Sequence, residues 1–198
     1  MKRIVFLVLL IVAVLLVTAC GKPPETQIQE SREAYRAAEE AGAPKYAAEA
    51  WNRARQAMEA LDAELEAQNG KFSLFRSYRK AAELAEQLAT AAKEAGAETT
   101  RRTSELRNEL SGMIADLKSL LQTARTRLAS LPRGAAVDAA ALRARLSSAG
   151  ERIDQAQRSL DAGRYDEAMA RAGDARETIR TVLRAVDSAA PPAPSKKR

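Results

Sequence analysis

Apolar residues recur at intervals of three and four positions through most of this chain, and this spacing restricts the fold to helices. The pattern is clear in Trp51, Ala54, Met58, Leu61 and Leu65, which all fall on one helical face. Alanine, leucine, arginine and glutamate dominate the composition and favour helices, whereas β-branched and aromatic residues are scarce after the first segment. The sequence therefore predicts an all-α protein.

Glycine and proline divide this pattern into predicted helices. We expect helices over residues 26–41, 44–69, 73–130, 138–162 and 165–188, because Gly42, Asn69-Gly70, Leu131-Pro132-Arg133-Gly134 and Ala162-Gly163 are typical helix ends. Pro44 suits a first turn, and Asp138 is a good N-cap. The long third segment has one weak point, Gly96. Continuity through Gly96 is favoured, and a break in Ala95-Gly96-Ala97 is the alternative.

Each half of the chain has the order helix, breaker, helix, short glycine turn, helix. We predict an elongated antiparallel helical bundle of two three-helix units, residues 26–98 and 99–188, that share the long central helix. A disordered basic tail is expected over residues 189–198. The largest core side chains are expected to be Trp51, Tyr35, Tyr78, Phe72 and Phe75.

The first twenty residues have the order of a secretory leader. Two cations precede an uninterrupted apolar run that ends at Val17, and Cys20, the only cysteine, follows the small residue Ala19. The run is shorter than the roughly 20 apolar residues of a membrane-spanning helix. A cysteine at this point resembles the precursors of bacterial lipoproteins, which implies cleavage of residues 1–19 and acylation of Cys20. The alternative is a signal anchor with an incidental cysteine.

Acylation would attach the mature chain to a membrane through a short tether, residues 20–25. Each buried lipid methylene contributes roughly 0.8 kcal/mol, and two or more chains give stable attachment. By the same resemblance, Gly21 in place of an aspartate implies the inner leaflet of the outer membrane, facing the periplasm. The inner membrane is the alternative. As a thioether, Cys20 would form no disulfide and would serve neither catalysis nor metal binding.

Residue types that carry catalysis are sparse in this sequence. The chain has no histidine, which removes ordinary catalytic triads and histidine metal sites, and it has no glycine-rich phosphate loop. The net charge of +6 is modest and mixed along the helices, which argues against nucleic-acid binding. We therefore expect no enzyme, cofactor, metal site or nucleic-acid partner. An enzyme or inhibitor of envelope hydrolases would have only acidic and aromatic side chains to use.

Phe72 and Phe75 are the candidate partner-contact residues, because they flank a predicted turn. The aromatic group around Trp51 is interpreted as bundle core, with a ligand or partner groove as the alternative. The C-terminal run Lys196-Lys197-Arg198 could touch anionic headgroups or cell-wall polymer, or act as a solubilising tail.

Two motifs carry a resemblance to a known family. They are Ala-Gly-Ala-x-x-Tyr at residues 41–46 and Tyr-x-x-Ala-x-x-x-Ala at residues 78–85. With the leader, they resemble an uncharacterised family of bacterial envelope lipoproteins, a domain of unknown function sometimes found with peptidoglycan-binding OmpA-like domains. The likeness covers roughly residues 20–100 and departs at Ala48 and Ala50, where proline and leucine are common, and around Phe72–Phe75. It implies an envelope location and a helical fold, and no reaction.

These features favour a lipid-anchored periplasmic protein that acts as a non-catalytic binding adaptor or scaffold in the cell envelope. Its expected partners are the membrane, through the anchor, and an envelope protein or peptidoglycan. The alternative is a structural spacer between membrane and cell wall that self-associates as a coiled-coil homo-oligomer.

Overall fold

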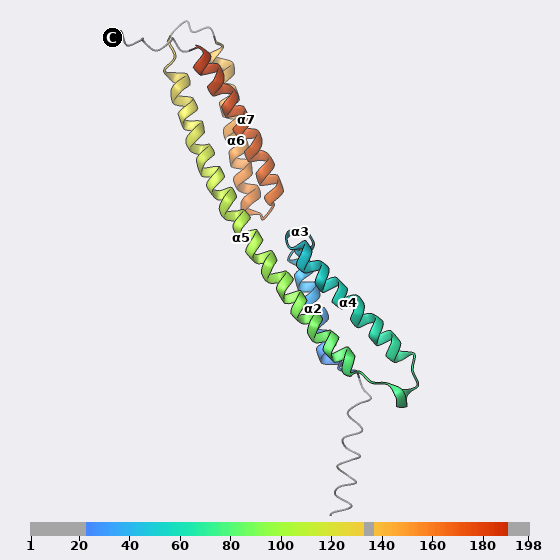
Figure 1. Cartoon of the computed structure of the whole chain (residues 1–198). Helices are drawn as coiled ribbons and strands as arrows, with labels where there is room; N and C mark the ends of the chain where they lie inside the picture. The colour runs from blue at the N-terminus through green and yellow to red at the C-terminus, as the bar shows by residue number, and fades with distance from the viewer. Residues whose placement is uncertain (1–22, 133–136, 190–198) are drawn as a thin grey trace, which may run out of the picture. The chain divides into compact units, whose positions relative to one another are not determined.

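The computed structural model describes residues 23–132 and 137–189, and within these ranges it contains helices and no strand (Figure 1). The all-α prediction is confirmed. The leader, Cys20 and the tail beyond Ala189 lie outside the described residues. The elements are α2 (Glu25–Glu40), α3 (Ala43–Tyr46), α4 (Ala48–Asn69), the 3-10 turn η1 (Ser73–Phe75), α5 (Arg79–Ala129), α6 (Ala139–Asp161) and α7 (Tyr165–Ala189).

The long helix α5 runs through Gly96 without a break, which confirms the predicted continuity. Its predicted start at Ser73 is wrong, because residues 70–78 form a separate loop and the helix begins at Arg79. The described chain divides into two compact units between Thr103 and Ser104, whereas the sequence placed the boundary between residues 98 and 99.

The core of unit 1 is built from the apolar seams of α2, α4 and the first part of α5. Trp51 is 9% exposed and packs against Tyr35, with ring centroids 4.4 Å apart and planes tilted by 30°. Alanine methyl groups surround this pair, and small side chains let the helices approach closely. The buried members of the unit include Ile28, Ala38, Ala43, Ala50, Ala54, Leu61, Tyr78, Ala81, Ala85, Leu88, Ala92 and Ala95.

Two aromatic residues expected in this core lie outside it. Phe72 is 69% exposed and Phe75 is 76% exposed, so the prediction that they contribute to the core is wrong. Both residues lie in the loop before α5, which Phe75 joins because this helix begins only at Arg79.

The turn between α2 and α4 gives the motif at residues 41–46 a structural explanation. Gly42 has a φ of +92°, a left-handed conformation that glycine adopts without strain, and its N–H donates to the Glu39 carbonyl at 2.9 Å. A Cβ atom on Gly42 would lie 3.2 Å from the Tyr46 ring. The predicted single helix from Pro44 to Asn69 is wrong, because Ala47, at φ −140° and ψ 48°, separates α3 from α4.

Unit 2 takes its core from the rest of α5, from α6 and from α7, with α6 and α7 side by side (Figure 1). Asp138 caps α6 as predicted, since its carboxylate accepts from the N–H groups of Ala140 and Ala141, both at 3.0 Å. The seam of α5 in this unit consists of Leu110, Ile114, Leu117, Leu121, Ala124 and Leu128. Met113 and Leu120 are partly buried and pack beside it.

The turn from α6 to α7 also follows its predicted chemistry. Gly163 has a φ of +71°, and its N–H donates to the Leu160 carbonyl at 3.0 Å. The Arg164 N–H donates to the Ser159 carbonyl at 2.8 Å, which completes the Schellman pattern of a helix end. The two helices therefore reverse direction within a few residues.

We expect Trp51→Ala to lower the free energy of unfolding of unit 1 by about 3–5 kcal/mol, because it removes the largest ring of a core otherwise made mostly of alanine. The measurement is thermal and urea unfolding followed by circular dichroism. Met169→Ala, at a residue 38% exposed in α7, is the control and should change stability by less than about 0.5 kcal/mol. A midpoint shift of only a degree or two for Trp51→Ala would refute its core role.

Candidate functional site

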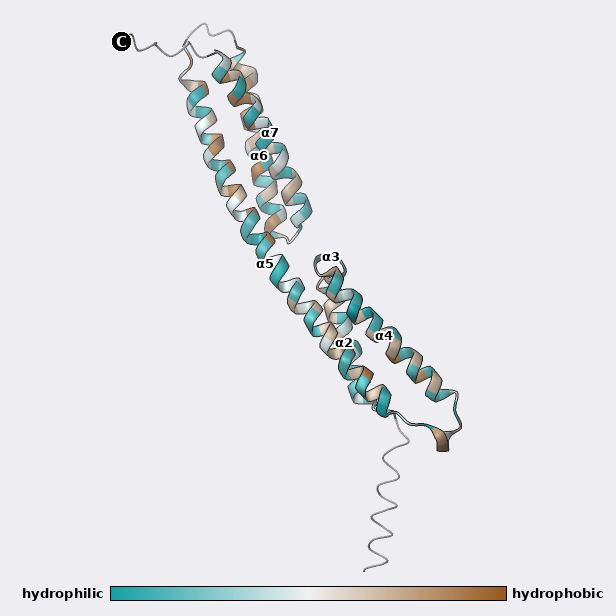
Figure 2. Cartoon of the chain, in the orientation of Figure 1, coloured by the Kyte–Doolittle hydropathy of each residue, from teal (hydrophilic) through white to brown (hydrophobic). Residues whose placement is uncertain are grey.

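The loop between α4 and α5, residues 70–78, contains three large apolar residues in and beside η1, whose ribbon has the brown of hydrophobic residues in Figure 2. Phe72, Leu74 and Phe75, here named the apolar tip, are 69%, 82% and 76% exposed. In the described part of the chain the other large apolar side chain at the surface is Met169, at 38%. Burying a leucine or phenylalanine side chain stabilises a protein by about 1.5–3 kcal/mol. The exposed tip lacks this stabilisation at each of its three residues. Exposed apolar clusters are typical of interaction surfaces, so the apolar tip is the candidate functional site.

The local backbone turns these side chains outward. Phe72 is extended, with φ −61° and ψ 142°, and the Phe75 N–H donates to the Phe72 carbonyl at 2.9 Å to close the 3-10 turn. The helix α4 ends at Asn69 as predicted, but Gly70 has φ −70° and ψ −15°. Gly70 therefore ends the helix in a right-handed conformation.

Hydrogen bonds hold this loop against the end of α4. The Arg76 guanidinium donates to the carbonyls of Lys71 and Asn69, both at 3.0 Å, and so satisfies an otherwise orphan carbonyl at the end of α4. The Tyr78 hydroxyl lies 3.1 Å from Asn69 Oδ1. Turning the tip inward would break these contacts, so the exposed arrangement is built into the loop.

Glu64 and Gln68 on α4 fasten the start of α5. The Gln68 amide donates to Glu64 at 2.6 Å, and Gln68 Oε1 accepts from the Ser77 N–H at 3.0 Å. Lys80 Nζ lies 3.1 Å from the other oxygen of Glu64, whose side chain is only 11% exposed. The hydrogen bond from Gln68, followed by that from Lys80, lowers the pKa of Glu64.

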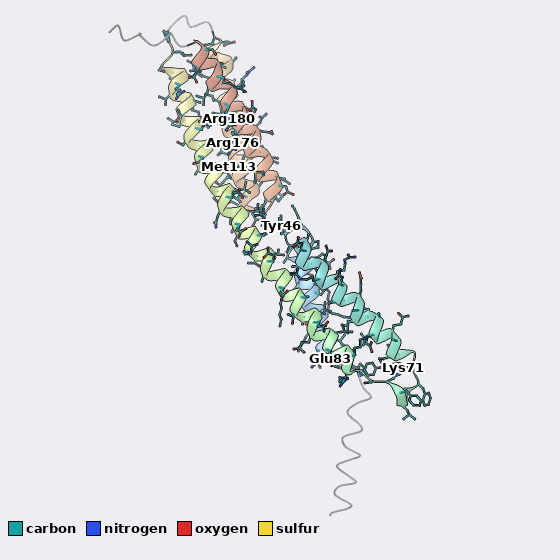
Figure 3. All side chains as sticks on the ribbon, in the orientation of Figure 1. Tyr46, Lys71, Glu83, Met113, Arg176 and Arg180 are labelled. Atoms are coloured by element: carbon teal, nitrogen blue, oxygen red, sulfur yellow. The ribbon has the colours of Figure 1, made fainter. Side chains whose placement is uncertain are left out.

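The structure brings Phe72 and Phe75, the two residues proposed from sequence, into one loop and adds Leu74 to them. Sequence reasoning missed Leu74 because it falls within the predicted helix 73–130, four residues before Tyr78, a spacing that places both residues on one helical face. The available signal was an apolar run bounded by Lys71 and Arg76. Lys71 is labelled in this loop in Figure 3. Cys20 lies outside the described residues, so its acylation stays a prediction.

A groove of about 630 Å³ in unit 1 is a weaker candidate site. It is lined by α3, the start of α4 and part of α5, and Tyr46 belongs to its wall. Its charges compensate one another: Arg53 lies 3.8 Å from Glu94, and Arg101 donates to Glu98 at 3.0 Å, which lowers the pKa of Glu98.

Within residues 23–132 and 137–189, no three acidic, thiol or imidazole side chains are grouped to hold a metal ion. In the same part of the chain, no helix combines the length and the apolar character needed to cross a bilayer.

We expect Glu64→Gln to destabilise unit 1 at pH 7 and to lose this effect in acid. Because the folded-state pKa of Glu64 is lowered from its usual 4.5, its carboxylate stabilises the fold above that value and stops doing so as the pH falls through the lower, folded-state pKa. Thermal melts of wild type and Glu64→Gln from pH 7 to pH 3 measure the difference in stability between the two proteins. Glu66→Gln, at an exposed neighbour, is the control. A stability difference that is independent of pH would contradict the stabilising role of the Glu64 carboxylate.

Comparison with protein-family models, with curated proteins and with solved structures finds no match to this chain. The resemblance over residues 20–100 therefore stays a prediction from the sequence motifs. Functional inference rests on those motifs and on the geometry of the described residues.

Proposed function

We propose that this chain is a lipid-anchored periplasmic protein of the bacterial envelope that serves as a non-catalytic binding adaptor or scaffold. One observation carries the proposal: a leader ending at Cys20 is followed, after the short tether with Pro23 and Pro24, directly by the helix α2 at Glu25. A thioether-linked diacylglycerol on Cys20, with an amide-linked chain on the new amino group, would then lie next to the folded helices. Gly21 favours the outer membrane by resemblance to other lipoproteins.

The helical core supports a single-chain adaptor over a self-associating spacer. Seam residues such as Leu61, Leu88 and Ile179 are fully buried by helices of the same chain, so the seams are already occupied. A coiled-coil oligomer would need such seams to face another copy. The finer architecture is part of this proposal: two three-helix units that share α5, each presenting charged outer faces to a partner in the envelope.

The resemblance to envelope lipoproteins supports the same location. Its motif at residues 41–46 corresponds to a turn with a structural requirement for Gly42, and its motif at residues 78–85 supplies Tyr78, Ala81 and Ala85 to the core of unit 1. These roles explain why the motif residues suit a helical unit. The partner is proposed to be an envelope protein or peptidoglycan.

Palmitate labelling in a bacterial host tests the anchor directly. We expect the wild-type chain to incorporate label and to sediment with membranes, and Cys20→Ala to do neither, because acyl transfer needs the thiol. Gly21→Asp is the matched control: it should still incorporate label, while shifting the protein toward the inner-membrane fraction. Label in Cys20→Ala would overturn the anchoring proposal.

Light scattering of the acylated protein in detergent, corrected for bound detergent, separates the adaptor from the spacer. We expect the mass of one 21.4 kDa chain, less its leader, because the seams are used within the chain. A stable trimer would support the spacer.

A further inference from the structure

The charged residues that flank the apolar tip in the sequence are all cations. Between Glu66 and Glu83 the sequence contains the cations Lys71, Arg76, Arg79 and Lys80 and no acidic residue. Two of these cations are engaged locally, since Arg76 donates to carbonyls and Lys80 pairs with Glu64. Lys71 is exposed, and the Arg79 side chain is 90% exposed with its Nε 3.9 Å from Glu83. The tip therefore presents apolar groups with cations beside them.

The chain enters unit 1 at the same end. Pro23 lines a groove together with Ile28, Leu65, Asn69 and Tyr78. Asn69 and Tyr78 are the residues at which the loop of the apolar tip begins and ends. Cys20 is three residues before Pro23, and three extended residues reach at most about 10 Å. A lipid anchor on Cys20 would thus meet the bilayer beside this loop.

We infer that the apolar tip is a second membrane contact, in which Phe72, Leu74 and Phe75 insert into the lipid interface while Lys71 and Arg79 meet anionic phosphate headgroups. This inference rests on the proposed lipid anchor for its geometry. Apolar and aromatic side chains flanked by cations are the combination that binds anionic bilayer surfaces. Three adjacent side chains, each at least two-thirds exposed on one loop, suit a deformable lipid surface better than a rigid protein pocket.

Fluorescence at one tip position tests the contact. In the acylated full chain Cys20 is a thioether, so Leu74→Cys provides the single free thiol for an environment-sensitive fluorophore. The control is Asn52→Cys, an exposed position on α4, about 25 Å along this helix from Asn69, after which the loop of the apolar tip begins. Unfolding midpoints should match wild type, because both positions are exposed. The protein is reconstituted in vesicles of zwitterionic lipid with or without anionic phosphatidylglycerol.

We expect a blue shift and a several-fold gain in quenching by lipid-attached quenchers at Leu74→Cys, and neither at Asn52→Cys. Adding Lys71→Gln and Arg79→Gln should reduce the quenching at Leu74→Cys in anionic vesicles and leave it unchanged in zwitterionic ones. Removing Arg176 and Arg180 of α7 in the same way is the matched control and should have no effect; Figure 3 labels both residues. Equal, water-like emission at positions 74 and 52 would overturn the inference and leave the lipid anchor untouched.

If the chain carries no lipid anchor, the labelling experiment gives a different result. An unacylated chain would be labelled at Cys20 as well, which contradicts the proposed function. The tip is then tested in a Cys20→Ser background with the same vesicles, where a blue shift at position 74 supports membrane contact and its absence overturns it. A photo-crosslinker at position 72 in cells separates the remaining occupants. An adduct with phospholipid supports the inference, whereas an adduct with protein alone overturns it.

Discussion

Burial of one narrow apolar seam per helix holds each unit of this chain together, and the rest of the structure depends on it. In unit 1 the seam of α5 is mostly alanine, so each contact buries little area but lets neighbouring helices approach closely around Trp51. In unit 2 the seam of α5 consists mainly of leucine and isoleucine. Among the described residues, the large apolar side chains that stay exposed are Phe72, Leu74, Phe75 and Met169. Three of these four side chains lie in the loop before α5, so this loop is the exception to the burial of large apolar groups.

Sequence reasoning succeeded where a local pattern determines the structure. The spacing of Trp51, Ala54 and Leu61 specifies a helical face directly, and all three residues are buried. Asp138 and Gly163 act through contacts within a few residues of themselves, so their roles can also be read from the sequence. It failed where a side-chain contact, and not the spacing of apolar residues, accompanies the beginning or end of a helix. The break at Ala47 accompanies packing of Tyr46 on Gly42, and the late start of α5 depends on Arg76 reaching back to Asn69.

The candidate site was foreseen only in part for the same reason. Phe72 and Phe75 were chosen because they flank a turn, but the spacing from Leu74 to Tyr78 fits a helix as well as a loop. The structure resolves this choice: Gln68 and Asn69 bind the end of the loop, and the three side chains of the tip are exposed to water. A lipid anchor alone would leave unit 1 free to swivel about its tether. A second contact beside the tether would fix the orientation of this unit at the bilayer.

The account depends most on the chemical state of the mature amino terminus. Intact-mass and peptide mass spectrometry of the protein purified from bacterial membranes measures it directly. The predicted result is a chain that begins at Cys20 and carries the added mass of a diacylglyceryl group and a third acyl chain. A chain that begins at Met1 with an unmodified thiol would contradict the account.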